Sequence, residues 1–576
     1  MVFYPQNVEE LKNVIDEFEA ISFDIWDTLI TRTVLQPEDV FAIVENRANQ
    51  MGIKASSFSS HRHEAVFQVV RANPNISEIY DALQKTMGIS DKEKNILMQL
   101  EIQVESEVIV VRREMVEVLK YAVLSGKKVN LISDMYLPGD IMETFLRQLD
   151  IVEYDKVFIS CDYRCLKKEG LYLFYKEKVQ AGTYLHIGDN PDSDIAFAEK
   201  WGINAVLIKS GYKLLQESIF AEIINRARTH NERCMAGLLA ACLFNSPFSE
   251  TGEARISCCK DLGWLFVAPL ISEFIVWLGN EMQKEQYDGI LFAARDGYLI
   301  QKLYDQMKSI RLNAFLPKGI YFLTSRALCT QAGIEDEKDI LWLASVKFHG
   351  SRQELLRYRF CLDVEDIMEM NGKEEIEYVL LHEDKILAKA SENRRNYLVY
   401  MMKQDIEANK NYAFFDFVSS GTSQFYLGKF VPFKITGKYF CRSITADEKA
   451  KIKIDSLYVN DGVEKADSLL YQNYKYLETI MTSLDPSLRY IDNGQNAIYD
   501  EEVRNTEELQ FVHEMHAAIE DYFKYFSSMC NWDEKISMGI AELLYHYMEN
   551  ECVTISCKTL DSMRLRDDWV REFAEK

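Results

Sequence analysis

The sequence is short of basic residues and has no CxxC pair, although Cys258 and Cys259 are adjacent. Lysine and arginine number 66 against 90 aspartates and glutamates, which gives a formal net charge of −24. This balance argues against a broad nucleic-acid-binding surface and against a polybasic membrane anchor. The 12 cysteines form no CxxC pair, and the 9 histidines show no zinc-ligand spacing with them. We therefore expect neither a nucleic-acid partner nor a structural zinc site.

Residues 1–10 lack the basic and apolar regions of a signal peptide, so we expect a cytoplasmic protein with reduced thiols. Residues 263–279 are mostly apolar but fall just short of a membrane-spanning helix, and they include Pro269 and Glu273. A carboxylate in the middle of a span is unfavourable in lipid. We expect a buried helix and no transmembrane span; a helix lying on a membrane surface is the alternative.

Four segments in the first 210 residues combine an apolar strand with polar residues at its end. The first, residues 21–30 (ISFDIWDTLI), runs into Asp24 and Asp27 and is followed by Thr28 and Leu29. An aspartate at the end of a strand lies at the carboxyl edge of a sheet, where open α/β folds bind ligands. The other segments end in Ser133, precede the lysine pair Lys167 and Lys168, and contain Gly188, Asp189 and Asp194.

The segments between these strands have helical patterns. Residues 8–20 form an amphipathic pattern, and residues 37–122 read as an all-helical insertion after the first strand. Strands that alternate with crossovers of a dozen or more residues predict a parallel sheet.

Together the four segments resemble the four ordered motifs of the haloacid dehalogenase-like (HAD) hydrolase superfamily, and the insertion resembles its helical cap. The resemblance covers roughly residues 15–210. It implies an α/β fold with a HAD-like Rossmannoid parallel sheet in residues 1–212, with the cap at about 36–122.

The resemblance implies a role for each motif residue. Asp24 would attack phosphorus and form an aspartyl-phosphate. Asp24, Asp189 and the backbone carbonyl of Trp26 would hold Mg²⁺. Ser133 would bind a phosphoryl oxygen, and a lysine would neutralise transition-state charge. Lys167 is preferred to Lys168 because Gly170 follows it at the spacing of closer relatives, and Asp194 would support the metal site.

One position departs from the family pattern. HAD phosphatases usually carry a second aspartate two residues after the nucleophile, which protonates the leaving group, whereas this chain has Trp26 there. Asp27 lies one residue further along, and a shift of one residue points a side chain the other way. Three outcomes follow: hydrolysis of a substrate with a good leaving group, an acid supplied by the cap or by Asp27, or binding without turnover.

The second half predicts another α/β domain over residues 213–500 and a helical region over 501–576. Its expected strands end in Arg295 and Asp296, in Arg326, and in Asp416 before a turn with Gly421 and Thr422. A helix N-terminus in such a turn suits an anion, so these residues form a candidate second site; structural caps or ion pairs are the alternative. The stretch ARDGYL also echoes the first motif, with Ala294 in the nucleophile position.

Four features occur in order: the opening SFDxxDTL, the apolar segment, the ARDG strand end and a DxxxxGTxQ-like turn. With them, nearly the whole chain resembles a group of large predicted HAD hydrolases often associated with bacterial surface-polysaccharide biosynthesis, sometimes joined to glycosyltransferases. That resemblance implies a Mg²⁺-dependent phosphatase for a sugar phosphate or related metabolite, with glycosyltransferases as partners. A true dehalogenase is the chemical neighbour. Two other hypotheses are a low-turnover binding or assembly component of polysaccharide synthesis, and glycosyl or phosphoryl transfer by the second domain.

Overall fold

The chain forms two compact units. Its computed structural model describes residues 2–3, 5–53, 55–69, 72–256, 258–311, 314–368, 374–443, 452–460, 474–549, 553–555, 566–567 and 572–573. Unit 1 consists of Met1–Arg255, Ser528–Leu543 and Glu551–Thr554. Unit 2 consists of Ile256–Ser527, Leu544–Asn550 and Ile555–Lys576.

Unit 1 is built on a six-stranded parallel sheet in the order β1-β8-β7-β2-β5-β6. All four residues of β2 are buried, because this strand lies between β7 and β5 in the middle of the sheet. The strands are β1 (Val2–Phe3), β2 (Ala20–Phe23), β5 (Lys128–Ser133), β6 (Lys156–Ile159), β7 (Tyr184–Gly188) and β8 (Asn204–Leu207).

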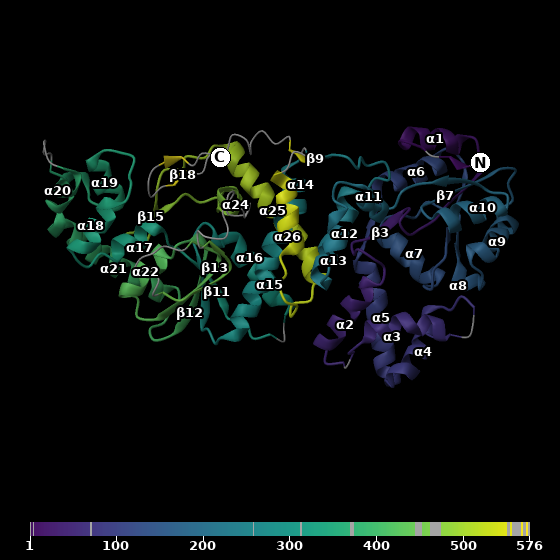
Figure 1. Ribbon diagram of the computed structural model, residues 1–576, viewed down its shortest axis with the longest axis horizontal. Helices are drawn as coiled ribbons and strands as arrows, with labels where there is room; N and C mark the ends of the chain where they lie inside the picture. The colour runs from purple at the N-terminus through teal and green to yellow at the C-terminus, as the bar shows by residue number, and fades with distance from the viewer. Residues whose placement is uncertain are drawn as a thin grey trace. The chain divides into compact units, whose positions relative to one another are not determined.

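Helices alternate with these strands, as the sequence pattern predicts (Figure 1). Each crossover returns the chain to the same edge of the sheet, so the carboxyl ends of the strands meet there. The helical segments are α1 (Val8–Asp16), α6 (Arg113–Leu124), α7 (Gly139–Gln148), α8 (Ser160–Tyr163), a 3₁₀ turn (Lys167–Glu169), α9 (Leu171–Lys178), a π-turn (Pro191–Ala196) and α10 (Phe197–Lys200). The α/β class with a parallel sheet is confirmed.

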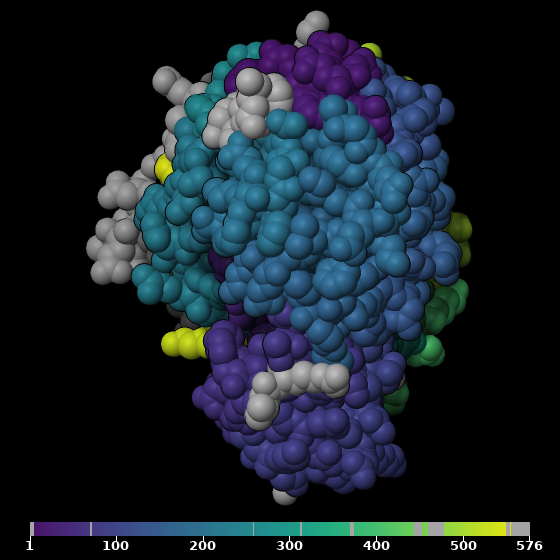
Figure 2. Space-filling view, turned by 90° about the vertical axis from the view of Figure 1, so that its right-hand side faces the viewer, coloured from purple at the N-terminus to yellow at the C-terminus, as the bar shows by residue number. Residues whose placement is uncertain are grey.

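The insertion after β2 is less uniformly helical than the sequence predicts. Two short antiparallel strands, β3 (Ile30–Arg32) and β4 (Ile109–Val111), form its base. The last predicted insertion helix, α6, packs against α1 beside the sheet, because its apolar face is needed there. The helices between the two strands form a separate lobe of unit 1 (Figure 2): α2 (Asp39–Gln50), α3 (Phe58–Gln68), α4 (Ile76–Met87) and α5 (Asp91–Glu107).

Residues after β8 extend unit 1 beyond the predicted domain boundary at residue 212. The helices are α11 (Gly211–Glu217), α12 (Glu222–Arg226) and α13 (His230–Leu243), followed by β9 (Ala254–Ile256). On α13, Arg233 forms an ion pair with Asp39 at 2.5 Å. Gly237 lies directly on the backbone of Val34. These contacts explain why the segment packs with unit 1.

Unit 2 contains a five-stranded parallel sheet in the order β11-β10-β12-β13-β14. The sequence predicts the first three of these strands but not the last two. The strands are β10 (Gly289–Ala293), β11 (Lys318–Phe322), β12 (Asn411–Ser419), β13 (Lys434–Ser443) and β14 (Ile454–Asn460).

The apolar segment of unit 2 is a core helix. Cys259–Lys284, which comprises α14 (Cys259–Leu262), a π-turn (Gly263–Val267) and α15 (Ala268–Lys284), is long and apolar enough to cross a membrane, but 89% of its apolar window is buried inside the structure. Phe274 of α15 contacts Phe415 of β12 and Phe440 of β13, with ring centroids 5.5 and 5.4 Å apart. The helix is therefore apolar because it covers one face of this sheet.

The other face of the sheet is covered by α17 (Arg326–Ala332), α21 (Glu383–Lys403) and α22 (Thr422–Phe430). Phe414, next to Phe415 on β12, packs with this group because alternate residues of a strand face opposite sides. Two elements complete the sheet layer: α16 (Gly297–Ile310) between β10 and β11, and a hairpin of β15 (Leu488–Ile491) and β16 (Ala497–Tyr499). A satellite cluster contains α18 (Glu337–Ser345), α19 (Arg352–Arg359) and α20 (Glu375–Leu380).

The last part of the chain is helical only at its start. Its helices are α24 (Tyr474–Met481), α25 (Thr506–Met529) and α26 (Gly539–Glu549). Beyond them the described residues form short strands rather than the predicted helix: β17 (Val553–Ile555), β18 (Arg566–Asp567) and β19 (Glu572–Phe573). The remaining residues of the predicted helical region after residue 549 lie outside the described part of the chain.

The close packing at Gly237 gives a stability test of unit 1. A Cβ at Gly237 would lie 2.3 Å from the carbonyl carbon of Val34, so Gly237→Ala must displace backbone. We expect a loss of about 1–3 kcal/mol in the free energy of unfolding, as for other overpacked sites, measured by urea denaturation. Gly252→Ala is the matched control, because no atom lies within 4 Å of that Cβ. Equal effects of the two substitutions would contradict the packing.

Candidate functional site

Asp24, Ser133 and Asp189 follow three neighbouring strands of unit 1. Phe23, the last residue of β2, pairs with Leu131 of β5 and with Ile187 of β7. Ser133 and Asp189 each lie two positions beyond these partners, at the same edge of the sheet as Asp24. Asp24 and Ser133 are buried. The strand register therefore places the three sequence-predicted residues around one point.

Lys167 reaches this point, whereas Lys168 does not. The Nζ of Lys167 donates to Oδ1 of Asp24 at 2.5 Å and to Oδ1 of Asp194 at 2.6 Å. Its backbone N–H donates to Oδ1 of Asp134 at 2.9 Å, which holds the 3₁₀ turn against the end of β5. Lys167 is 2% exposed, and Lys168 is exposed to solvent. The structure thus separates the two lysines that sequence spacing alone could not.

Asp194 is held close to the strand that carries Asp189. Its Oδ2 accepts a hydrogen bond from the backbone N–H of Asn190 at 3.0 Å. A Cβ at Gly188 would lie 2.3 Å from this oxygen, so glycine at the end of β7 is required for the approach. The carboxylate ligand atoms of Asp24, Asp189 and Asp194 all lie within 4.8 Å of one another.

These carboxylates strongly perturb one another. Burial raises the pKa of Asp24 to about 7, although the Lys167 ammonium opposes the rise. Burial also raises the pKa of Asp189 well above its usual value, and the charges of Asp27, Asp194 and Asp24 add to the rise. Burial acts to raise the pKa of Asp194, but the combined effects of Lys167 and His186 lower it. One lysine therefore faces an excess of negative charge.

A divalent cation fits this donor set. Asp24, Asp189 and Asp194 offer oxygen ligands, which hard cations prefer, at separations that one ion can bridge. Neighbouring carboxylates add to the burial that raises the pKa of Asp189. A bound cation would compensate their negative charge.

Trp26 and Asp27 are both engaged by other side chains. The guanidinium carbon of Arg32 lies 3.6 Å from the centroid of the Trp26 ring. The indole N–H is buried and has no hydrogen-bond partner among the described residues. Arg32 in turn bonds Glu105 of α5 at 2.9 and 3.1 Å. Asp27 has a left-handed backbone, with φ 55°, and its Oδ1 accepts from Thr31 Oγ1 at 2.7 Å. The position of the usual acid is thus an indole packed beneath an arginine that is tied to the insertion.

Several residues of this site carried no recognisable sequence signal. Arg112 is fully buried and donates to the backbone carbonyls of Asp27, Lys209 and Asn245, which ties three loops together. Burial lowers its pKa to about 10, against the opposing charge of Asp27. Arg112 and Arg32 belong to no motif, and only the folded chain brings them to the site.

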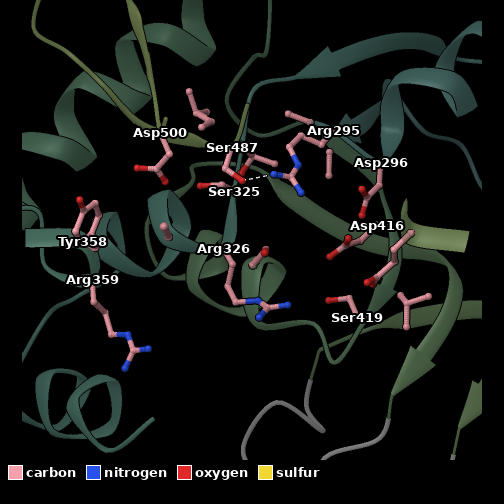
Figure 3. Close-up of a pocket in the computed structure, with 18 of the residues that line it drawn as sticks. Arg295, Asp296, Ser325, Arg326, Tyr358, Arg359, Asp416, Ser419, Ser487 and Asp500 are labelled. Carbon is pink, nitrogen blue, oxygen red and sulfur yellow. Dashed lines mark hydrogen bonds between the residues drawn. The ribbon is translucent and has the colours of Figure 1, made fainter. Parts of the chain in front are cut away.

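The residues of the candidate second site gather in unit 2. Arg295, Asp296, Arg326 and Asp416 line a cavity of about 210 Å³ at the carboxyl ends of β10, β11 and β12 (Figure 3). Gly421 and Thr422, at the start of α22, are buried and do not line it, whereas Ser419 at the end of β12 and Ser423 of α22 do. Sequence reasoning missed further lining residues because they lie outside the strands that the sequence predicts: Phe348, Tyr358, Ser487 and Asp500.

Comparisons with known proteins found one family model and solved structures that are similar to parts of this chain. Residues 168–223, which include Asp189 and Asp194, match the model of a family described as HAD-hydrolase-like. One solved structure, described as a dehalogenase, is 20% identical, with a TM-score of 0.25 over 34% of this chain and 85% of the other. Another, a dehalogenase with an intermediate complex, is 18% identical, with a TM-score of 0.25 over 33% and 85%. No curated protein matches the sequence. Residues 168–223 of unit 1 are therefore similar to part of a HAD-like hydrolase.

The two adjacent lysines give a direct test of this geometry. Lys167→Met removes the ammonium from two buried carboxylates, and breaking such a buried pair typically lowers the free energy of unfolding by about 3–5 kcal/mol. Lys168→Met changes an exposed residue, and we expect less than about 0.5 kcal/mol. Chemical denaturation without divalent cations measures both. A larger loss for Lys168→Met would overturn the assignment.

Proposed function

We propose that unit 1 is a Mg²⁺-dependent phosphatase that hydrolyses a phosphate ester of a sugar or a related small metabolite, with Asp24 as the nucleophile. The observation that carries this proposal is the clustering of Asp24, Asp189 and Asp194 at the carboxyl edge of the sheet, where Lys167 bonds Asp24 and Asp194. One buried ammonium does not balance three carboxylates and a dianionic substrate. The site therefore needs a cation to bind such a substrate. The HAD-like match in residues 168–223 supports the same chemistry.

The reaction follows from the placement of these side chains. A carboxylate oxygen of Asp24 forms a bond to phosphorus, and the bond from phosphorus to the ester oxygen breaks. Water then attacks phosphorus, which releases inorganic phosphate and restores the Asp24 carboxylate. Lys167 lies against Asp24 and stabilises negative charge on the phosphoryl oxygens. Ser133, buried at the end of β5, donates its hydroxyl to one of them.

Mg²⁺ would be held by Asp24, by Asp189 and by the backbone carbonyl of Trp26, with Asp194 supporting the site. When bound, the ion neutralises charge between the nucleophile and the phosphate. Asp194 already accepts from Lys167, so it fixes the ammonium beside the nucleophile. The pKa of Asp189 is raised, and a bound cation would stabilise its ionised form.

The leaving group receives little help from this chain. The indole of Trp26 donates a hydrogen bond but does not transfer a proton near neutral pH. The carboxylate of Asp27 is held by Thr31 and lies close enough to Asp189 to raise its pKa. We therefore assign a substrate whose leaving oxygen needs little protonation.

A second candidate function is ligand binding with little turnover. The contact of Arg32 with both Trp26 and Glu105 favours it, because a stacked indole occupies the position from which an acid would act. Tight binding of a sugar phosphate without phosphate release, in the presence of Mg²⁺, would support this function over hydrolysis.

The first test is phosphate release from p-nitrophenyl phosphate, which has a good leaving group. We expect Mg²⁺-dependent turnover that a chelator abolishes. Asp24→Asn should lower kcat by at least about a thousandfold, since it removes the nucleophile. Asp192→Asn is the control, because Asp192 is exposed in the loop beside Asp189. Turnover that survives Asp24→Asn would contradict the proposal.

The position of Trp26 gives a second, sharper test. Trp26→Asp places a carboxylic acid where the indole stands, so we expect hydrolysis of a poor leaving group such as glycerol phosphate to rise by about a hundredfold, the lower end of the effect of a positioned acid. Hydrolysis of p-nitrophenyl phosphate should change little. Trp26→Asn suffers the same loss of packing without a proton to give, and no such rise is expected. Equal rates for the two variants would show that the missing acid does not limit this site.

A further inference from the structure

The cavity of unit 2 lies where an open parallel sheet reverses its strand order. The first strand of this sheet, β10, lies between β11 and β12, the next two strands in the chain. The connections to them leave in opposite directions, which opens a crevice at the carboxyl ends where such sheets bind ligands. The lining residues Ala293–Asp296 and Thr324–Ala327, together with Asp416, Val418 and Ser419, come from these three strand ends.

Four strands of the two units share one arrangement. In unit 1 the order β8-β7-β2-β5 places the first strand beside the second, and in unit 2 the order β13-β12-β10-β11 does the same. Ala294 follows β10 as Asp24 follows β2. Ala293 pairs with Phe322, so Thr324 stands in the register of Ser133. The cavity of unit 2 thus keeps a hydroxyl at the end of its second strand but has a methyl group where unit 1 has its nucleophile.

The cavity has charges of both signs, and Asp500 lies across the space from Asp296 and Asp416 in Figure 3. Figure 3 shows Asp296 and Asp416 close together, with the guanidinium groups of Arg295 and Arg326 on their side of the space. Burial raises the pKa of Asp296 to about 6 against the opposing charge of Arg295, and Asp416 adds to the rise. Arg295 has a left-handed backbone, with φ 72°, which is unfavourable for a side chain of its size.

The third arginine of the lining has a structural task instead. Arg359 is buried and donates to the backbone carbonyls of Leu343, Val346 and Lys347. Its guanidinium is turned away from the cavity in Figure 3. Arg295, in contrast, donates to Ser487 at the wall of the cavity. Arg295 and Arg326 are therefore the cations that a bound anion would meet.

The turn before α22 adds hydroxyl groups and backbone amides. Gly421 has φ 83°, and a Cβ there would lie 2.5 Å from Ile452, so this position needs glycine to form the turn. The first N–H groups of a helix have no partner inside the helix and attract an anion. Ser419 and Ser423, on either side of the turn, line the cavity.

We infer that the cavity of unit 2 is a second binding site, which holds a phosphorylated sugar without hydrolysing it. The phosphate faces Arg295, Arg326 and the start of α22, because guanidinium groups and helix N-termini recognise phosphate oxygens. The sugar faces Asp296 and Asp416, whose carboxylates accept hydrogen bonds from hydroxyl groups. Two carboxylates repel a bare phosphate, so a ligand with one anionic and one hydroxyl-bearing end matches the cavity better.

The rest of the cavity agrees with this ligand. Its volume of about 210 Å³ suits a single small molecule rather than a dinucleotide. Tyr358 and Phe348 add aromatic surface to the polar lining. Ala294 supplies no nucleophile, so bound phosphate is not transferred to the protein. The inference does not depend on catalysis at Asp24.

The test measures binding of glucose 1-phosphate to the full chain carrying Asp24→Asn, so that unit 1 does not consume the probe. We expect binding by calorimetry, and slower amide hydrogen exchange in peptides that cover residues 293–300 and 416–427. Glucose and inorganic phosphate, measured separately, should each bind at least about tenfold more weakly, since each leaves one set of partners unused. No phosphate should be released.

Matched variants assign the binding to this cavity. Arg326→Gln and Asp416→Asn should each weaken binding of glucose 1-phosphate by at least about tenfold, because each removes a charged hydrogen bond. Arg326 is exposed, so its substitution leaves the core intact. Arg395→Gln, on an exposed part of α21 away from the lining, should have no effect.

Three results would overturn the inference. The first is no binding of glucose 1-phosphate. The second is binding that Arg326→Gln and Asp416→Asn leave unchanged, with exchange slowed only in peptides of unit 1, which would place the probe at the Asp24 site. The third is inorganic phosphate that binds as tightly as glucose 1-phosphate, which would show an anion site without a sugar subsite.

Discussion

The contact of one lysine with two buried carboxylates is the interaction on which the site of unit 1 depends. Lys167 bonds Asp24 and Asp194, and Asp189 lies within reach of both. Removing such charges from water is unfavourable by several kcal/mol per ion, so they stay ionised only where partners are fixed. The parallel sheet supplies that fixation, because it brings the ends of β2, β5 and β7 to one edge. Because the carboxylates outnumber the lysine, their negative charge would attract a cation. A phosphate could then bind to that cation.

The insertion after β2 acts on this edge through a chain of side chains. Glu105 of α5 bonds Arg32, and Arg32 lies on Trp26, two residues after Asp24. The hydroxyl of Tyr136, just beyond β5, also donates to Glu105, at 3.2 Å. The helical lobe therefore contacts the strand ends directly beside Asp24. The same contacts tie the indole of Trp26 to the lobe.

The sequence predicted the central part of unit 1 because strand ends and their polar residues are local patterns. Asp24, Ser133, Lys167 and Asp189 each follow a strand that periodicity reveals, and the sheet brings them together. Arg112 and Arg32 could not be predicted, since their roles arise from contacts with residues far away in the chain. The strands β13 and β14 could not be predicted for a related reason: they belong to no recognisable motif.

The bounds of the domains were harder to predict from the sequence than the type of each element. The segment 213–255 packs with unit 1 through Arg233 and Gly237. No change in amino-acid composition marks this boundary in the sequence. In unit 2 the predicted Arg295, Asp296, Arg326 and Asp416 do line one cavity, whereas the turn contributes Ser419 and Ser423 in place of Gly421 and Thr422. Which side chain of a turn faces a cavity depends on backbone dihedrals that sequence spacing does not give.

The central claim is that Asp24 accepts a phosphoryl group beside a cation held by neighbouring carboxylates. A crystal structure of the chain with Mg²⁺ and beryllium trifluoride, a mimic of the phosphoryl group, tests it most directly. We expect beryllium bonded to a carboxylate oxygen of Asp24, with Mg²⁺ in contact with Asp24 and Asp189 and with Lys167 beside a fluoride. Beryllium trifluoride bound elsewhere, or an Asp24 that still contacts only Lys167 with both reagents present, would contradict the account.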